Sequence, residues 1–282
     1  IIVHISTLDM LTNVAIDLPD LALELARAFW PGPLTLVLKR HPNIPATVSA
    51  GRDTVAVRMP SHPVAAGLIA ASDRPIAAPS ANTFSRPSAT TAAHVLEDLG
   101  GRIDLILDGG AAPIGLESTV LDLTDVPVIL RPGGVTLEHL RTIIPGLQTR
   151  SQYLAMDAAA DAPGQLIKHY SPHAQMRLFD GPRPAVLARM LAEAQERSAA
   201  GEIVGILTSE DERPHFVGLP ADVISLDADA AGMGVHLFAA LREFDQRGMT
   251  IILARLPETA GLGAAVRDRL IRAAEGRVIH VE

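Results

Sequence analysis

The stretch Phe29-Trp30-Pro31-Gly32-Pro33-Leu34-Thr35-Leu36-Val37-Leu38 places a helix end, a turn and a buried strand next to one another. Apolar residues at helical spacing predict a helix over residues 19–29, which the two prolines and the glycine end. The apolar run that follows predicts a strand over residues 34–38. Further strands are predicted over residues 1–5, 54–58, 75–78, 103–107, 119–123 and 128–130, and further helices over residues 62–71 and from Thr90 to Leu99. Since strands and helices do not simply alternate, residues 1–150 are expected to form a mixed α/β domain, a twisted mixed sheet with flanking helices.

The remainder of the chain has a different pattern. Residues 151–176 lack hydrophobic periodicity and are interpreted as a linker. From residue 177 to residue 282, helices and strands alternate. Helices are predicted over residues 184–198, 233–247 and 264–274, and strands over residues 202–207, 223–226 and 250–253. This alternation predicts a small, Rossmann-like parallel α/β domain.

Composition excludes several classes of function. The 282 residues include no cysteine, which excludes disulfides, thiolate metal sites and a cysteine nucleophile. The net charge is −8 and both halves are acidic, which argues against a strong duplex-binding surface. The sequence has no zinc-type histidine spacing, no GxSxG elbow and no P-loop, and no apolar run has the length of a membrane span. The chain opens inside an apparent strand, so we expect a missing segment before Ile1.

Polar residues at strand ends are the candidates for ligand binding. Arg58 and Arg131 each end an apolar strand and are followed closely by proline, which suits recognition of a carboxylate or phosphate. A surface salt bridge is the alternative for Arg58. Ser80 and Asn82 leave a buried strand, where either ligand contacts or an ordinary turn would place them. Ser88 precedes a predicted helix N-terminus, a position that favours anions.

The segment Lys168-His169-Tyr170-Ser171-Pro172 stands out in the linker as a basic and aromatic cluster. It could close over a ligand as a lid, or it could anchor the linker. His4 lies in an apolar strand, where a core histidine is the commoner outcome. From the residues alone, we expect an α/β enzyme that binds a small anionic ligand or a nucleotide.

The ordered succession of several strings resembles the Sua5/YciO/YrdC family, in its two-domain Sua5 type, over nearly the whole chain. The strings are Ile2-Val3-His4-Ile5, Phe29-Trp30-Pro31-Gly32-Pro33-Leu34-Thr35, Val57-Arg58-Met59-Pro60, Ala78-Pro79-Ser80-Ala81-Asn82, Gly115-Leu116-Glu117-Ser118-Thr119-Val120, Leu130-Arg131-Pro132-Gly133, Lys168-His169-Tyr170-Ser171-Pro172 and Gly261-Leu262-Gly263-Ala264-Ala265.

This resemblance implies a fold and an activity. The fold would be a YrdC-like domain followed by a small Rossmann-like domain. The activity would be that of a nucleotidyltransferase that condenses L-threonine, bicarbonate and ATP into threonylcarbamoyl-AMP and pyrophosphate. The product would serve t6A modification of tRNA at adenosine 37 through Kae1/TsaD-type transferase machinery in the cytoplasm. Mg²⁺ would travel with ATP, and no tightly bound cofactor and no membrane partner are expected. Direct tRNA binding is left open.

The resemblance also implies roles for individual residues, with no covalent nucleophile and no protein metal ligand. Threonine would be bound by His4, Arg58, Ala78 and Ser118. ATP would be bound by Thr54, Ser80, Asn82, Ser88, Arg131 and Tyr170. Replacement of Tyr170 by alanine is expected to weaken nucleotide binding while leaving the fold intact.

The chain departs from the family at three places. Phe84-Ser85-Arg86 replaces a usual Ser-Gly pair, and Ser88-Ala89 stands where the family more often has Ser-Pro. A segment with a Thr-Val-Tyr-Gly string and a Lys-x-Arg pair is absent before Ile1, so the chain as given is expected to be an incomplete enzyme. The alternative is an RNA- or nucleotide-binding YrdC/YciO-like protein without efficient synthase activity.

Overall fold

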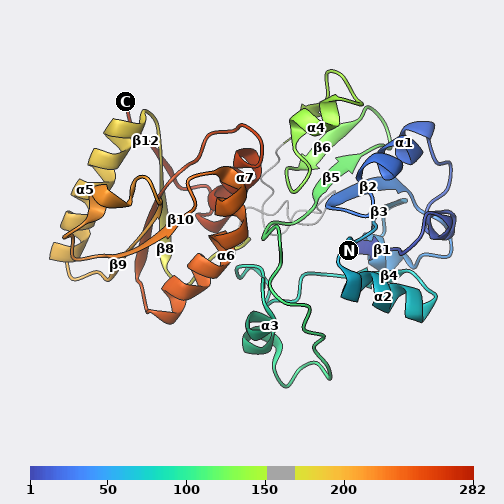
Figure 1. Cartoon of the computed structure of the whole chain (residues 1–282), viewed down its shortest axis with the longest axis horizontal. Helices are drawn as coiled ribbons and strands as arrows, with labels where there is room; N and C mark the ends of the chain where they lie inside the picture. Colours follow the sequence, from blue (N-terminus) through green and yellow to red (C-terminus); the bar gives the residue numbers. More distant parts are fainter. Residues whose placement is uncertain (151–168) are drawn as a thin grey trace. The chain divides into compact units, whose positions relative to one another are not determined.

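Two β-sheets organise the chain, one built mainly from each half of the sequence (Figure 1). The computed structural model describes residues 1–150 and 169–282. The first sheet has seven strands in the order β4-β1-β3-β2-β5-β6-β7. Parallel pairs such as β1–β3 alternate with antiparallel pairs such as β2–β3, which confirms the expected mixed sheet. The strands are β1 (Ile2–His4), β2 (Leu34–Lys39), β3 (Thr54–Arg58), β4 (Ile76–Ala78), β5 (Thr119–Asp122), β6 (Val128–Arg131) and β7 (Gln148–Thr149).

The main apolar core lies on one face of this sheet, and the opposite face carries polar groups beside a small buried cluster of Val37, Val120 and Leu130. Helix α1 (Asp20–Phe29) packs its apolar stripe on the buried face, and Leu25 of this helix is completely buried. Val55 and Val57 of β3 join the same core. Because side chains alternate along a strand, Arg58 points to the opposite face. The remaining helices of this half are α2 (Pro63–Ser72), α3 (Ala92–Leu99), α4 (Leu137–Arg141) and the 3₁₀ segments η1 (Asp9–Asn13) and η2 (Ala46–Ser49).

The Trp30–Pro33 turn carries the chain from α1 into β2. The indole Nε1 of Trp30 donates a buried hydrogen bond of 2.7 Å to the carbonyl of Leu34. The backbone N–H of Gly32 donates to the carbonyl of Met59, just beyond the end of β3, at 2.9 Å. These bonds fix the turn beside the end of β3, where Arg58 lies.

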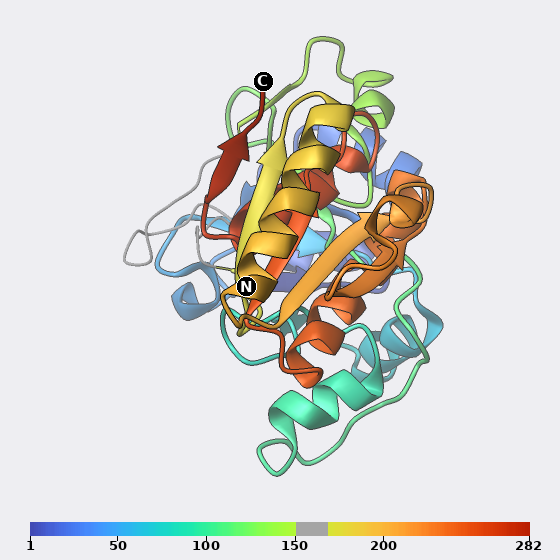
Figure 2. The same ribbon diagram turned by 90° about the vertical axis from the view of Figure 1, so that its left-hand side faces the viewer.

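The second sheet is entirely parallel, with the strand order β10-β9-β11-β8-β12. Helix α5 covers one face and helices α6 and α7 cover the other (Figures 1 and 2). Gly205 of β9 permits this packing, because a Cβ atom there would lie 2.8 Å from the ring of Phe244 on α6. The expected Rossmann-like parallel domain is therefore confirmed. Its elements are β8 (Gln175–Asp180), α5 (Arg183–Ala199), β9 (Val204–Ser209), η3 (Arg213–Phe216), β10 (Asp222–Leu226), α6 (Ala230–Gln246), β11 (Ile251–Arg255), α7 (Gly263–Ala273) and β12 (Val278–His280).

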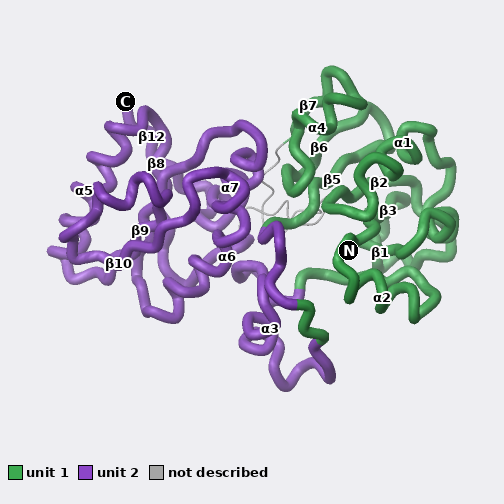
Figure 3. The backbone as a smooth tube through the Cα atoms, in the orientation of Figure 1, with its two compact units in different colours: residues 1–80, 107–109, 116–166 green, residues 81–106, 110–115, 167–282 purple. Residues whose placement is uncertain are grey.

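The chain divides into two compact units that are not continuous in sequence (Figure 3). Unit 1 comprises Ile1–Ser80, Leu107–Gly109 and Leu116–Leu166. Unit 2 comprises Ala81–Ile106, Gly110–Gly115 and Ile167–Glu282. The segment 81–106, with helix α3, thus belongs to the same unit as the parallel sheet. Most of the expected linker, residues 151–168, lies outside the described residues.

Two local predictions are wrong. Residues 103–107 form no strand, and their apolar side chains are exposed, Leu105 by 74%. Apolar alternation makes a segment suitable for a strand, but a strand also needs a neighbouring strand to hydrogen-bond with, and residues 103–107 have none among the described residues. Helix α3 begins at Ala92, two residues after the predicted start at Thr90, and its N-cap is Thr91, whose hydroxyl accepts the His94 N–H. The sequence patterns also did not predict β7, β8, β12 or α4.

Candidate functional site

The polar face of the first sheet brings His4 and Arg58 together. They are register partners across the parallel strands β1 and β3. The Nε of Arg58 donates to the Gly32 carbonyl at 3.0 Å, which fixes the guanidinium against the Trp30–Pro33 turn. Its remaining N–H groups make no hydrogen bond and no ion pair within the described part of the chain, so they are available to an anionic ligand.

Ser118 and Arg131 form a second, fully buried part of this site. Arg131 is 3% exposed and donates from Nε and Nη2 to the Ser118 carbonyl at 3.1 and 2.9 Å. The Ser118 hydroxyl also lies 2.7 Å from the Thr35 hydroxyl. Gly133 allows the close approach of the two loops, since a Cβ atom there would lie 2.4 Å from the Glu117 carbonyl oxygen. Arg131 therefore holds Ser118 in place.

The electrostatics of this cluster favour an anion. Burial, and then the positive charge of Arg131, lower the pKa of Arg58 to about 10, so that the guanidinium stays charged at neutral pH. Burial, and then the charge of Arg58, lower the pKa of His4 to about 4, so that its imidazole is neutral. A carboxylate or phosphate bound between the two arginines would relieve their mutual repulsion.

Three other predicted residues lie on unit 1. Ala78 ends β4 and is the register partner of Ile2 on the neighbouring β1. Ser80 follows two residues later and is exposed. Thr54 begins β3 and shares a strand face with Arg58, four positions along the strand. The structure thus places Ala78 near the His4 strand and sets Thr54 at the opposite end of β3 from Arg58.

Asn82 and Ser88 lie on a loop of unit 2. The Asn82 side-chain amide donates to the carbonyls of Thr83 and Arg86 at 2.9 and 3.2 Å, which folds the loop around it. Its Oδ1 is buried and has no hydrogen-bond partner within the described part of the chain. Ser88 is 7% exposed. The loop therefore keeps a buried acceptor for which the described residues provide no donor.

Tyr170 is buried in unit 2, with 1% of its surface exposed. Its ring centroid lies 5.1 Å from that of Phe238 on α6. The guanidinium carbon of Arg269 on α7 lies 5.3 Å from the same centroid, which is cation–π distance. Of the two roles that the sequence left open, this placement corresponds to an anchor. Lys168, in the same string, lies outside the described residues.

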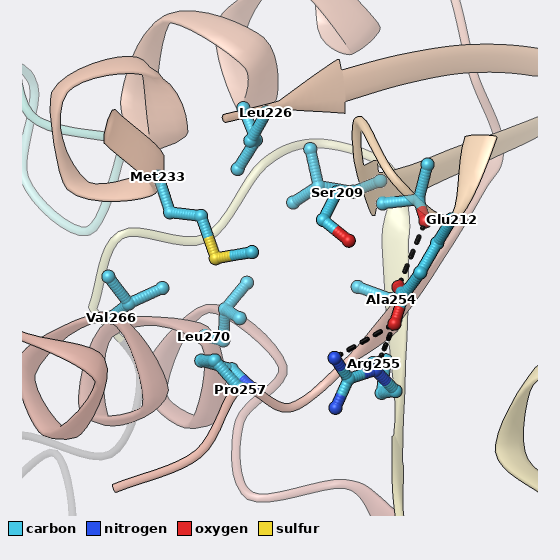
Figure 4. A pocket seen from close by; sticks show the side chains of 11 residues that line it. Ser209, Glu212, Leu226, Met233, Ala254, Arg255, Pro257, Val266 and Leu270 are labelled. Carbon is cyan, nitrogen blue, oxygen red and sulfur yellow. Dashed lines mark hydrogen bonds and ion pairs between the residues drawn. The ribbon is translucent and has the colours of Figure 1, made fainter. Parts of the chain in front are cut away.

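The sequence patterns did not single out a small cavity in unit 2 (Figure 4). Its volume is about 30 Å³, and it lies where β9, β10 and β11 end. Leu226 and Met233 form part of its apolar wall, and Glu212 and Arg255 form an ion pair at its edge. The carboxyl ends of parallel strands are frequent positions for ligands. The predicted parallel strands were therefore the one feature of the sequence that could have pointed to this cavity. None of the predicted site residues lines this cavity.

Within residues 1–150 and 169–282, no three His, Asp or Glu side chains are grouped as a metal site would require. No helix in these ranges has the length and apolar character needed to cross a membrane.

Comparison with known proteins finds two family models that together cover most of the chain. The Sua5_yciO_yrdC model, described as "Telomere recombination", matches residues 1–133. The Sua5_C model, described as "Threonylcarbamoyl-AMP synthase, C-terminal domain", matches residues 135–275.

Curated relatives and a solved structure agree with these matches. A threonylcarbamoyl-AMP synthase of Pyrococcus abyssi is 40% identical over 286 residues, covering 100% of this chain and 82% of the relative. The Bacillus subtilis protein of the same name is 39% identical, covering 99% of this chain and 80% of the relative. The crystal structure of P. abyssi Sua5 complexed with L-threonine superposes with a TM-score of 0.93 at 41% identity, covering 100% of this chain and 82% of that one.

Proposed function

The chain belongs to the Sua5/YciO/YrdC family of threonylcarbamoyl-AMP synthases, and on this premise we propose how its own residues serve that reaction. The single observation that carries the proposal is the cluster of Arg58, Arg131, Ser118 and His4 on the polar face of the first sheet. The family resemblance and the physical chemistry of this cluster point to the same chemistry, the binding of an anionic substrate.

The proposed reaction needs positioning and charge stabilisation and no protein nucleophile. The amine of L-threonine combines with bicarbonate to give a carbamate and water. A carbamate oxygen then attacks the α-phosphorus of ATP, and the bond to the β-phosphate oxygen breaks. The products are threonylcarbamoyl-AMP and pyrophosphate, so the enzyme is a nucleotidyltransferase.

Arg58 would bind the threonine carboxylate. Its Nε is already held by Gly32, so its Nη groups can present a fixed pair of donors. The neutral imidazole of His4 lies beside it and can accept a hydrogen bond from the threonine without adding a positive charge. Ser118, held by Arg131, and the backbone of Ala78 would complete the threonine contacts.

The nucleotide contacts are assigned to Thr54, Ser80, Asn82, Ser88, Arg131 and Tyr170. For Asn82, the buried unpartnered Oδ1 supports this assignment, because a donor on the ligand would satisfy it. Tyr170 would have to leave its buried position to reach a nucleotide. Mg²⁺ would arrive with the ATP phosphates and supply charge neutralisation there. The product would pass to t6A transferase machinery in the cytoplasm.

The test is pyrophosphate release from ATP by the purified protein. We expect release that requires both threonine and bicarbonate, and formation of threonylcarbamoyl-AMP in equal amount. Arg58→Ala should lower release several-fold at threonine concentrations that just saturate the wild type. Release that is independent of threonine would overturn the proposal, as would no release from a folded, ATP-binding protein expressed from the complete reading frame.

A further inference from the structure

Helix α6 of unit 2 contacts the end of the loop that runs from Asn82 to Ser88 directly, and it reaches the start of the loop through Asp98. The contacts come from Arg242 and Asp245, which lie three positions apart and therefore on one face of the helix. We propose that Arg242 and Asp245 are positioning residues that hold the 82–88 loop in its nucleotide-binding form. This inference rests on the proposed function, because that function assigns Asn82 and Ser88 to the nucleotide.

Arg242 connects to the start of the loop through Asp98. It donates from Nη1 to Asp98 Oδ1 at 3.0 Å and from Nη2 to Asp98 Oδ2 at 2.8 Å. The same Oδ2 accepts the backbone N–H of Thr83 at 2.9 Å. Thr83 directly follows Asn82, so a chain of two charge-assisted contacts fixes the backbone beside the Asn82 side chain.

Arg242 also holds the end of the loop directly. Its Nη2 donates to the Pro87 carbonyl at 2.6 Å, and Pro87 directly precedes Ser88. One guanidinium, 5% exposed, thus fixes both ends of the loop. The planar fork of an arginine can hold the two Asp98 oxygens side by side and still donate to the Pro87 carbonyl, and a lysine ammonium lacks this planar bidentate geometry.

The charge distribution supports this arrangement. The hydrogen bonds from Arg242 are the largest of the effects that lower the pKa of the Asp98 carboxyl, and the Thr83 N–H lowers it further. The carboxylate is therefore ionised at neutral pH and keeps both of its oxygens as acceptors. Because the pair is largely removed from water, each contact has a stronger effect than a surface ion pair would.

Asp245 extends the contact to residues 171–173. Its carboxylate accepts from Arg86 of the loop and from the backbone N–H of His173 at 2.7 Å. Arg86 in turn donates to the Ser171 carbonyl at 3.2 Å. Arg86 therefore joins the loop, residues 171–173 and helix α6, and it lies where the family usually has Ser-Gly.

The proposal predicts a selective loss of nucleotide affinity. The hydrogen bonds of Arg242 lead to Asn82 and Ser88, whereas the threonine contacts lie on the first sheet. We expect Arg242→Met, which retains the apolar stem, to weaken ATP binding about tenfold and to change threonine binding less than about twofold. Arg247→Met is the matched control, since Arg247 is the C-cap residue directly after the same helix but pairs with Asp222 and Glu243.

The experiment is isothermal titration of ATP and, separately, of threonine into each purified variant, with thermal unfolding as a check of folding. If Arg242→Met fails to fold, because the Asp98 carboxylate has lost its cationic partner, the double variant Arg242→Met with Asp98→Asn removes that charge. The double variant is then used in the titrations in place of the single one. ATP affinity within about twofold of wild type in a folded Arg242 variant would overturn the proposal, as would equal losses for ATP and threonine.

Asn82→Ala separates this proposal from the proposed function. If Asn82→Ala weakens ATP binding and Arg242→Met does not, α6 is not a positioning helix, while the assignment of the loop to the nucleotide survives. If neither variant weakens ATP binding, the assignment of the loop has failed and the positioning role is overturned with it.

Discussion

His4 and Arg58 face each other as register partners on the parallel strands β1 and β3. Neither residue is a conventional core residue, yet both are partly buried, and each pKa is lowered. Arg58 is a buried cation close enough to Arg131 for the charge of Arg131 to lower its pKa, and two such cations cost free energy unless an anion compensates them. The pair is therefore arranged for a ligand that carries a negative charge, as the carboxylate of threonine does.

Replacement of Arg58 by alanine should weaken threonine binding about 30-fold, because charge-assisted hydrogen bonds to a carboxylate contribute about 2 kcal/mol. Arg58→Lys should recover only part of the loss, since a lysine cannot bind both carboxylate oxygens with a planar fork. Titration calorimetry with threonine measures both. The exposed Arg74 offers a control, and threonine affinity that is equal in Arg58→Ala and Arg74→Ala would contradict the assignment.

The lowered pKa of His4 predicts a specific loss of stability in acid. In the unfolded chain the imidazole takes up a proton near its ordinary pKa of 6.5, whereas in the folded protein it does so near 4. Its contribution is therefore fully present above about pH 6.5 and lost as the pH falls toward 4, by about 3 kcal/mol in all. Urea unfolding of the wild type and of His4→Gln across this range measures the difference. Parallel pH profiles for the two proteins would contradict it.

Tyr170→Ala should destabilise the protein by about 3 kcal/mol, because it removes a fully buried aromatic ring from between Phe238 and Arg269. This expectation differs from the one drawn from the sequence, which foresaw an intact fold. Tyr170→Phe keeps the ring and should lose much less stability. Thermal unfolding of both variants distinguishes an anchor from a freely moving lid, and an unchanged melting temperature in Tyr170→Ala would exclude the anchor.

Gly133→Ala should destabilise unit 1 by several kcal/mol and weaken threonine binding as well. A Cβ atom at Gly133 would lie 2.4 to 2.5 Å from backbone atoms of Glu117, Ser118 and Thr119, so the Ser118 loop would have to move. Gly67→Ala is the control, because Gly67 lies within α2 and its Cβ would meet nothing within 4 Å. That change should be neutral or stabilising by up to about 1 kcal/mol. Similar melting temperatures for the two variants would show that the loops of Gly133 and Ser118 can move apart without a loss of folding free energy.

Local patterns were sufficient for most helices and strands. The proline-glycine turn after Phe29 ends α1 in the structure as the sequence predicts, and β2 begins at Leu34. The same reasoning failed at residues 103–107, where apolar alternation produced no strand. It also missed β8 and β12, whose short runs are interrupted by charged or polar residues and are strands because they pair in a parallel sheet.

The sequence by itself determined the order of the two folds, because turns, helix ends and hydrophobic alternation are local properties. Its ordered strings of residues also determined the family and the residue types of the anionic site. Only the tertiary structure decided which residues meet. Arg242 binds Asp98 across 144 positions of sequence, and His4 pairs with Arg58 across two strands that are not consecutive. Such contacts depend on how sheets and helices pack, since burial of apolar surface stabilises the whole arrangement and no local pattern encodes the partner.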